Sequence, residues 1–302
     1  MADESTYTTG ASIIDSEYIS RTVGKAILEH SIMLPLMRIE NLQGVPARVA
    51  SFPIAPSMTL TTKSTDNTAT SNAAWTPTSV EATCVEYSWK TVVTDMLKES
   101  SVTDPMAQIV MEAERALLDK VDSIAMALFG GFTGATQAAG STGVDLTHLA
   151  CLVALRNLKT NFKGGADNAV FVLSPMGVYD LGAELITPVT NGASPAYART
   201  DLSSLFGSAV QNTGMTSALA GFVAGKYPVF SSTNVPADGT TDRHGCCFVP
   251  GEAIGCAIKW MPRVEFGRDL PNGINGDIVM ASIAFGVCEL RDTAGVKIFE
   301  DY

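Results

Sequence analysis

The chain has 302 residues and a mass of 31.8 kDa, enough for one large domain or two modest ones with a substantial core. The formal net charge of -11 excludes a protein whose affinity comes from clustered Lys and Arg on phosphates. Apolar residues make up 46% and charged residues only 17%, which excludes disorder over most of the chain. So weakly charged a surface indicates burial between copies of the same protein.

The sequence shows no sign of secretion or of a membrane span. No apolar run approaches the roughly 18 to 20 residues that cross a bilayer. The first five residues, MADES, are acidic and polar where a secretory signal would be basic and then apolar. We therefore expect cytoplasmic synthesis, no membrane partner, and reduced, mostly buried thiols at the cysteines. These are Cys84, Cys151, Cys246, Cys247, Cys256 and Cys288.

The first 44 residues are predicted to form an N-terminal arm and a short helix. Residues 1–20 are polar and rich in Thr. From Arg21 to Met37 the apolar residues recur with a helical spacing, and Pro35 is expected to end that helix.

Residues 45–98 are predicted to form an extended β-hairpin. Ala47–Ile54 and Cys84–Val93 alternate as strands do, and we expect them to be its two arms. Residues 55–82, between the arms, are dominated by Thr, Ser, Asn, Ala and Pro, so this segment should project from the body. Trp75 is an aromatic side chain in this polar segment, which is typical of a protein contact.

Residues 99–144 carry the clearest helix of the sequence and a linker after it. Asp104 is a good helix cap, Pro105 suits the first helical position, and Gly130-Gly131 should end the helix. At about 1.5 Å per residue the helix is about 40 Å long, so it should act as a strut. Its apolar stripe is Met106, Ile109, Val110, Ala113, Leu117, Val121, Ile124 and Leu128.

Residues 145–255 and 256–302 mix helices and strands without regular β-α-β alternation, which predicts an α+β fold. In the first region we expect helices over 145–162, 174–185 and 201–210, and strands over 169–173, 221–230 and 246–249. In the second we expect strands over 257–266, 278–290 and 295–299.

No motif for catalysis, a cofactor or a metal is legible. The sequence has three histidines but no nucleophile motif, such as G-x-S-x-G, with which one of them could act as a base. The histidines are His30, His148 and His244. Cys246 and Cys247 are adjacent in a strand and point to opposite sides, and no second ligand pair follows them. The acidic pairs of the long helix are expected on its solvated or subunit-facing side: Glu112, Glu114, Asp119 and Asp122.

The order of elements and several short stretches resemble the major capsid proteins of tailed bacteriophages, which have the Hong Kong 97-like fold. The long helix continues from Asp104-Pro105 as MAQIVMEAERALLDKVDSIAMALFGG. Three shorter stretches agree with the resemblance: VLSP at 172–175, GKYPV at 225–229 and VEFGRD at 264–269.

The resemblance implies a division of the chain and a structural role. It implies an N-terminal arm (1–44), an E-loop hairpin (45–98), a spine helix with linker (99–144), an axial domain (145–255), and peripheral strands with the C-terminal strand (256–302). Such subunits form the hexamers and pentamers of an icosahedral phage head that encloses double-stranded DNA. They have no catalytic site and need no cofactor.

The resemblance also implies contacts and partners. The E-loop lies across a neighbouring subunit, so Lys63, a residue type that some members crosslink, and Trp75 are candidate contacts. Residues 262–277 resemble the peripheral loop, with Arg268 and Asp269 as its charged contacts. The sequence lacks the scaffolding extension of some members, so we expect a separate scaffolding protein, along with a portal; a processed product is the alternative. DNA would be enclosed without sequence-specific binding, in a virion capsid assembled from protein made in the bacterial host cytoplasm.

Three alternatives remain open at this point. An encapsulin-like compartment would share the fold and enclose protein cargo instead of a genome. A phage decoration or receptor-binding module would be smaller and dominated by β-structure, which the long helix disfavours. A hydrolase would require a nucleophile and a base, which the sequence does not display.

Overall fold

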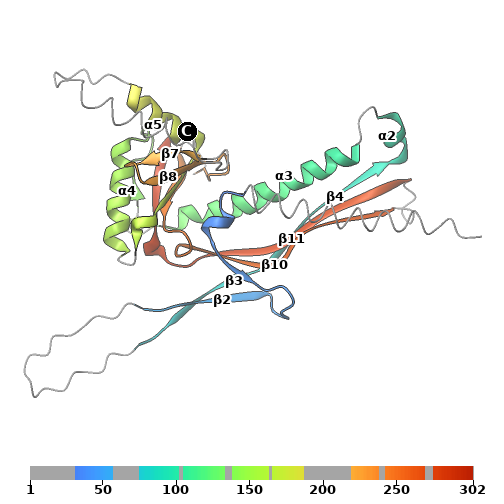
Figure 1. The fold of residues 1–302 in the computed structure, drawn as a ribbon, viewed down its shortest axis with the longest axis horizontal. Coiled ribbons are helices and arrows are strands. Elements are labelled where there is room, and N and C mark those ends of the chain that lie inside the picture. The colour runs from blue at the N-terminus through green and yellow to red at the C-terminus, as the bar shows by residue number, and fades with distance from the viewer. Residues whose placement is uncertain are drawn as a thin grey trace, which may run out of the picture.

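Two β-sheets, a long helix and a projecting hairpin organise the chain (Figure 1). The computed structural model describes residues 31–56, 75–101, 105–132, 138–162, 165–186, 219–237, 242–268 and 275–301. The helices expected over 201–210 and over the first part of 21–37 lie outside the described residues. Helices and sheets are both prominent, in agreement with the mixed class predicted from the sequence.

The first sheet is a four-stranded layer that runs along most of the length of the molecule (Figure 1). Its strand order is β1 (Arg38–Asn41), β10 (Ile254–Arg268), β11 (Gly276–Glu289) and β4 (Val85–Thr94). β10 and β11 form a long antiparallel pair, and β1 joins β10 in parallel. A short helix, α2 (Asp95–Ser100), follows β4 at the far end of the sheet.

One face of this sheet is covered by α3 (Pro105–Met126), which the 3-10 helix η2 (Ala127–Gly131) continues. The prediction that this helix starts at Pro105 and ends at Gly130-Gly131 is confirmed. Its stripe packs into the main core through the buried side chains of Ala113, Leu117, Val121 and Ala125.

The second sheet has six strands. Its order is β5 (Ala138–Ala139), β12 (Gly295–Asp301), β9 (Asp242–Phe248), β6 (Val170–Leu173), β8 (Tyr227–Ser231) and β7 (Leu219–Val223). The C-terminal strand β12 therefore pairs with β9 and β5, not with β10 or β11.

Two helices pack with the second sheet, α4 (His148–Asn161) and α5 (Pro175–Ile186). α4 begins three residues after the expected Asp145, because the Thr147 hydroxyl accepts a hydrogen bond from the Ala150 N–H at 3.2 Å and caps the helix. α5 begins where predicted, and the Ser174 hydroxyl accepts the Gly177 N–H at 3.1 Å.

The expected pairing of the projecting hairpin is wrong in one arm. β2 (Val49–Ile54) pairs with β3 (Thr78–Thr83), whereas residues 85–94 form β4 in the four-stranded sheet. β3 has the polar sequence TSVEAT and buries only one of its side chains, so it has no apolar alternation to mark it as a strand. Residues 75–83 therefore return to the body along β2, and the chain enters the main sheet only after Cys84.

Two further boundaries differ from expectation because prolines sit inside regular structure. Pro35 lies in the first turn of the 3-10 helix η1 (Leu34–Leu36), where its missing N–H costs nothing. Pro262 lies in β10, within the strand expected over 257–266, but β10 continues to Arg268, so residues 262–268 of the segment that resembles a peripheral loop are strand. Register irregularities between Ile258 and Arg263 interrupt the β10–β11 ladder there, which makes room for a residue without an N–H.

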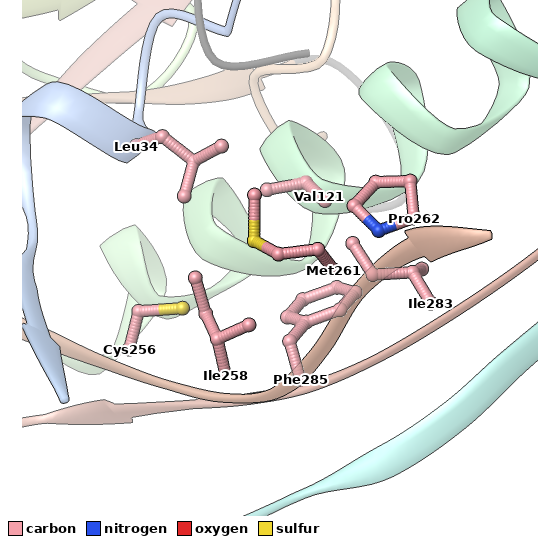
Figure 2. A pocket seen from close by; sticks show the side chains of 8 residues that line it. All are labelled: Leu34, Val121, Cys256, Ile258, Met261, Pro262, Ile283 and Phe285. Carbon is pink, nitrogen blue, oxygen red and sulfur yellow. The ribbon is translucent and has the colours of Figure 1, made fainter. Parts of the chain in front are cut away.

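The main core fills the space between α3 and the sheet and contains a small void. Eight apolar residues from the N-terminal segment, α3, β10 and β11 line a cavity of about 10 Å³ (Figure 2). The void is the size of a single water molecule and has no polar lining atom, so it is a packing gap. Its lining is Leu34, Val121, Cys256, Ile258, Met261, Pro262, Ile283 and Phe285.

Candidate functional site

The exposed apolar side chains are the first feature that points to function. Met96 on α2 is 78% exposed, Leu149 on α4 is 68% exposed, and Tyr179 on α5 is 67% exposed. Such side chains do not stabilise an isolated subunit while they are exposed to water, whereas a contact with another chain would bury them. The other exposed large apolar residues are Ile39, Val45, Val49, Trp75, Val85, Leu97, Met111, Val144, Leu152 and Met176.

α2 has no buried residue and is joined to its surroundings by a cap and two ion pairs. The Thr94 hydroxyl caps it by accepting the Leu97 N–H at 3.3 Å. Asp95 forms an ion pair with Arg268 of β10, with 2.8 Å between Oδ2 and Nη2, and Lys98 pairs with Asp277 of β11. Both ion pairs join α2 to the end of the β10–β11 pair, beside which the helix lies (Figure 1).

The structure places two of the four predicted contact residues. Trp75 is 54% exposed and lies three residues before β3, on the projecting hairpin. Arg268 is the last residue of β10 and pairs with Asp95 within the same chain. Lys63 and Asp269 lie outside the described residues. Trp75 and Arg268 belong to different ends of the molecule, so the structure does not bring them together (Figure 1).

The projecting hairpin has a small core of its own where it meets the body. Phe52 and Ala50 of β2 are buried, as is Ala82 of β3. They pack on residues of the four-stranded sheet on the face opposite α3. The hairpin therefore leaves the body from a fixed base and reaches beyond it (Figure 1). The body residues of this cluster are Leu42, Cys84, Ala257, Cys288 and Leu290.

Asp122 on α3 is a buried acid, contrary to the prediction that the acidic pairs of this helix face solvent or another subunit. Its carboxylate accepts the Ser31 hydroxyl at 2.6 Å and the Ile32 and Met33 N–H groups at 3.2 Å each. Burial raises the pKa of this carboxyl, and the hydrogen bonds oppose that rise. Asp122 thereby fastens the end of the N-terminal segment to α3.

Glu300 on β12 is a second buried acid that sequence reasoning missed. One carboxyl oxygen accepts the Ser174 N–H at 2.8 Å at the start of α5. Gly177 and Gly245 make room for the side chain, since a Cβ atom at either position would collide with the carboxyl. Burial is the largest cause that raises the pKa of Glu300, to about 7, and the nearby Arg243 partly opposes it.

The cysteines of the described residues are buried, and no metal-ligand cluster is found among these residues. All six cysteines are buried and unbonded to one another, and burial raises the pKa of the thiol at Cys246 and Cys247. Within the described ranges, no three side chains of the His, Cys, Asp or Glu type are placed to hold a metal ion. The helices of the same ranges include none long and apolar enough to cross a membrane.

A shallow open pocket of about 350 Å³ lies at the start of α5. Its lining offers one cation and two hydroxyl groups, of which the Ser174 hydroxyl lies beside the Glu300 carboxyl. The lining residues are Ser174, Pro175, Met176, Thr233 and Arg243.

A family model described as "Phage capsid protein" matches residues 78–298, from the start of β3 to β12. The chain belongs to the phage capsid protein family. Members of this family are structural, and this capsid protein forms the shell of the phage head. A search of curated proteins finds no significant match.

Solved phage capsids share the fold of this capsid protein at low sequence identity. The capsid of Ralstonia phage GP4 superposes with a TM-score of 0.66 at 11% identity, covering 90% of this chain and 91% of that chain. The Mycobacterium phage Che8 structure gives 0.64 at 18% identity, covering 89% and 91%. The capsid of Cyanophage P-SCSP1u gives 0.63 at 14% identity, covering 90% and 88%. The likeness thus spans nearly the whole chain.

Proposed function

We propose that this capsid protein assembles as pentamers and hexamers of an icosahedral head, with the β2–β3 hairpin lying across a neighbouring subunit. The observation that carries the proposal is the hairpin itself, whose described residues are buried only near its base and present Trp75 to solvent. A two-stranded hairpin is marginal in water on its own, so its outer part gains stability from a partner. A second copy of the chain is the partner that a closed shell supplies.

The Hong Kong 97-like division of the chain is part of the same proposal. Residues 1–44 are the N-terminal arm. Within residues 45–98, the E-loop hairpin consists of β2, β3 and the segment between them, because β4 belongs to the four-stranded sheet. Residues 99–144 are the spine helix with its linker. The axial domain comprises residues 145–255 and also β12, because β12 pairs with β9. The peripheral strands expected in residues 256–302 are β10 and β11, and β4 pairs with β11 in the same sheet.

Contacts between capsomers are proposed at the end of the molecule that carries α2. Arg268 and Asp269 are its charged contacts, and Met96 and Leu97 add apolar area beside them. The ion pair between Arg268 and Asp95 supports this role, because it joins α2 and β10 into one surface. Lys63, with Trp75, is a proposed contact of the hairpin.

The proposed partners follow from a shell role. They are copies of this chain, a separate scaffolding protein, a portal, and double-stranded DNA held without sequence-specific contacts. The net charge of -11 supports the last point, because a basic wall would bind packaged DNA tightly. We also propose synthesis in the bacterial host cytoplasm, and neither catalysis nor a cofactor.

Replacing Trp75 with Ala tests the proposal. Thr76→Ala is the matched control, since Thr76 is an exposed residue of the same segment with a much smaller side chain. Trp75→Ala should leave the circular dichroism spectrum and Tm of the subunit unchanged and lower the yield of particles, because an interface Trp commonly contributes about 2 kcal/mol or more. Thr76→Ala should assemble normally. If Trp75→Ala forms particles as well as Thr76→Ala does, the hairpin contact is refuted.

A further inference from the structure

We infer that Gly286 and Gly255 form a glycine seat on the four-stranded sheet that sets the direction in which the β2–β3 hairpin leaves the body. The inference rests on the proposed function, in which that hairpin reaches a neighbouring subunit. The seat acts in the isolated chain, where it sets the direction of the hairpin before any partner binds.

Gly286 is the first contact of the seat. A Cβ atom at this position of β11 would lie 2.6 Å from the carbonyl carbon of Thr83, closer still to its oxygen, and 3.0 Å from the Cys84 nitrogen. All of these atoms belong to the backbone, which cannot turn aside as a flexible side chain can. The end of β3 therefore lies directly on β11, and only glycine permits this approach.

Gly255 on β10 is the second contact, and it receives a side chain from the other arm. A Cβ atom there would lie 3.2 Å from Cζ of Phe52 and 2.9 Å from Cδ2 of Leu290. The Phe52 ring is fully buried, and Arg38 stacks on it with 5.8 Å between the guanidinium carbon and the ring centroid. β2 is thus held at Gly255 as β3 is held at Gly286.

The two glycines lie close together on the same face of the sheet. Gly286 is opposite Ala257 in the β10–β11 register, and Gly255 is opposite Cys288. Four small residues on neighbouring strands thus let both arms come down onto the sheet, and β3 is in contact with both β10 and β11. Two points of contact define a direction, whereas one point would leave a pivot.

Two hydrogen bonds join the arms to each other at the base of the hairpin, and a third joins this base to the sheet. The Cys84 N–H donates to the Arg48 carbonyl at 2.9 Å, and Arg48 Nε donates back to the Cys84 carbonyl at 2.9 Å. The Cys84 thiol also donates to the Ala257 carbonyl of β10 at 3.5 Å. Such pre-organisation lowers the entropy cost of docking the hairpin on a neighbour, so the seat favours one geometry of assembly.

Three glycine substitutions of different severity test the seat. In Gly286→Ala the backbone of Thr83 must retreat by about 1 Å to restore an ordinary contact. Gly255→Ala meets only the ends of two side chains, so its effect should be smaller. Gly267→Ala is the matched control, because a Cβ atom at this position of β10 meets nothing within 4 Å.

The direction of the hairpin can be measured in full-length unassembled subunits by double electron–electron resonance. Spin labels on Ser79→Cys and Met111→Cys report it, since both positions are exposed and the native cysteines are buried. Ser79 lies about 13 Å along β3 from Thr83, at about 3.3 Å per residue, so a tilt at the base is carried outward.

The expected result is graded. Gly286→Ala should shift or widen the distance distribution by about 2 Å or more, Gly255→Ala by less, and Gly267→Ala not at all. A distribution in Gly286→Ala identical to that of the parent overturns the seat. If Gly286→Ala does not fold, Phe52→Leu takes its place, because it removes the aromatic ring that packs on Gly255. Phe52→Leu should widen the distance distribution. An unchanged distribution in Phe52→Leu would overturn the seat.

Particle yield separates the seat from the proposed function. We expect Gly286→Ala to lose particles and Gly267→Ala to keep them. If the hairpin shifts in Gly286→Ala and particles still form normally, the seat stands and the proposed role of the hairpin in assembly fails.

Discussion

The buried carboxyl of Glu300 should make the stability of the subunit depend on pH, and Glu300→Gln should remove that dependence. In the native chain the pKa of Glu300 is raised from 4.5 to about 7, because burial disfavours the charged form. The native state therefore holds a proton between these two values that the unfolded chain has lost. Stability from this group is complete below pH 4.5, falls as the pH rises, and is lost above about pH 7.

The size of the effect follows from the two pKa values. One pKa unit corresponds to about 1.4 kcal/mol, so the carboxyl should cost about 3 kcal/mol of unfolding free energy between pH 4.5 and pH 8. Gln keeps an oxygen that can accept the Ser174 N–H and carries no charge at any pH. Glu300→Gln should therefore be about equal to the parent at low pH and more stable at pH 8.

The assay is urea unfolding of isolated subunits at pH 5 and pH 8. The quantity of interest is the pH-dependent change in the unfolding free energy of the parent minus that of the variant, because acids that do not interact with Glu300, such as Asp122, cancel in that difference. Glu265→Gln, at an exposed position of β10, is the control and should leave the pH dependence unchanged. Equal pH dependence in the parent and in Glu300→Gln would show that the carboxyl is not held in the buried state described.

Two substitutions on α3 test its packing. Leu117→Ala should lower the unfolding free energy by about 2 to 5 kcal/mol, because it leaves a cavity in the main core. Met111→Ala, on the exposed side of α3, should change the unfolding free energy little. Equal effects of the two variants in urea unfolding would contradict the assigned buried face. Asp122→Ala should cost about 3 kcal/mol, because the Ser31 hydroxyl and two backbone N–H groups lose their acceptor, and residues 31–34 should then exchange their amides faster. Unchanged exchange there would show that Asp122 is not the fastening.

The elements with strong local signals could be predicted from the sequence. The long helix from Pro105 was legible because its apolar residues recur on one face over six turns and a proline and two glycines mark its ends. The strand β3 was not, because TSVEAT owes its place to backbone pairing with β2 and to two small apolar side chains, Val80 and Ala82. A hairpin arm stabilised mainly by backbone hydrogen bonds leaves little trace in the sequence.

The residues that fasten distant segments could not be predicted for a related reason. Asp122 is about 90 positions from the segment that it holds, and Glu300 is 126 positions from Ser174. Each acid looks like an ordinary surface residue beside its neighbours in the sequence. The glycine seat could not be predicted either, because Gly286 looks like any glycine of an apolar strand in the sequence. Its role depends on the contact with the backbone of Thr83. Such roles depend on tertiary contact, which periodicity does not report.

Hydrogen exchange of the hairpin in subunits and in particles tests the central claim most directly. The amides of residues 75–83 that β2 does not pair should exchange quickly in the isolated subunit. In particles, at equal pH and temperature, the same amides should be protected, because the hairpin is docked on the next subunit. Equal exchange in the two states would contradict the account, since the hairpin would then project from the shell without holding it together.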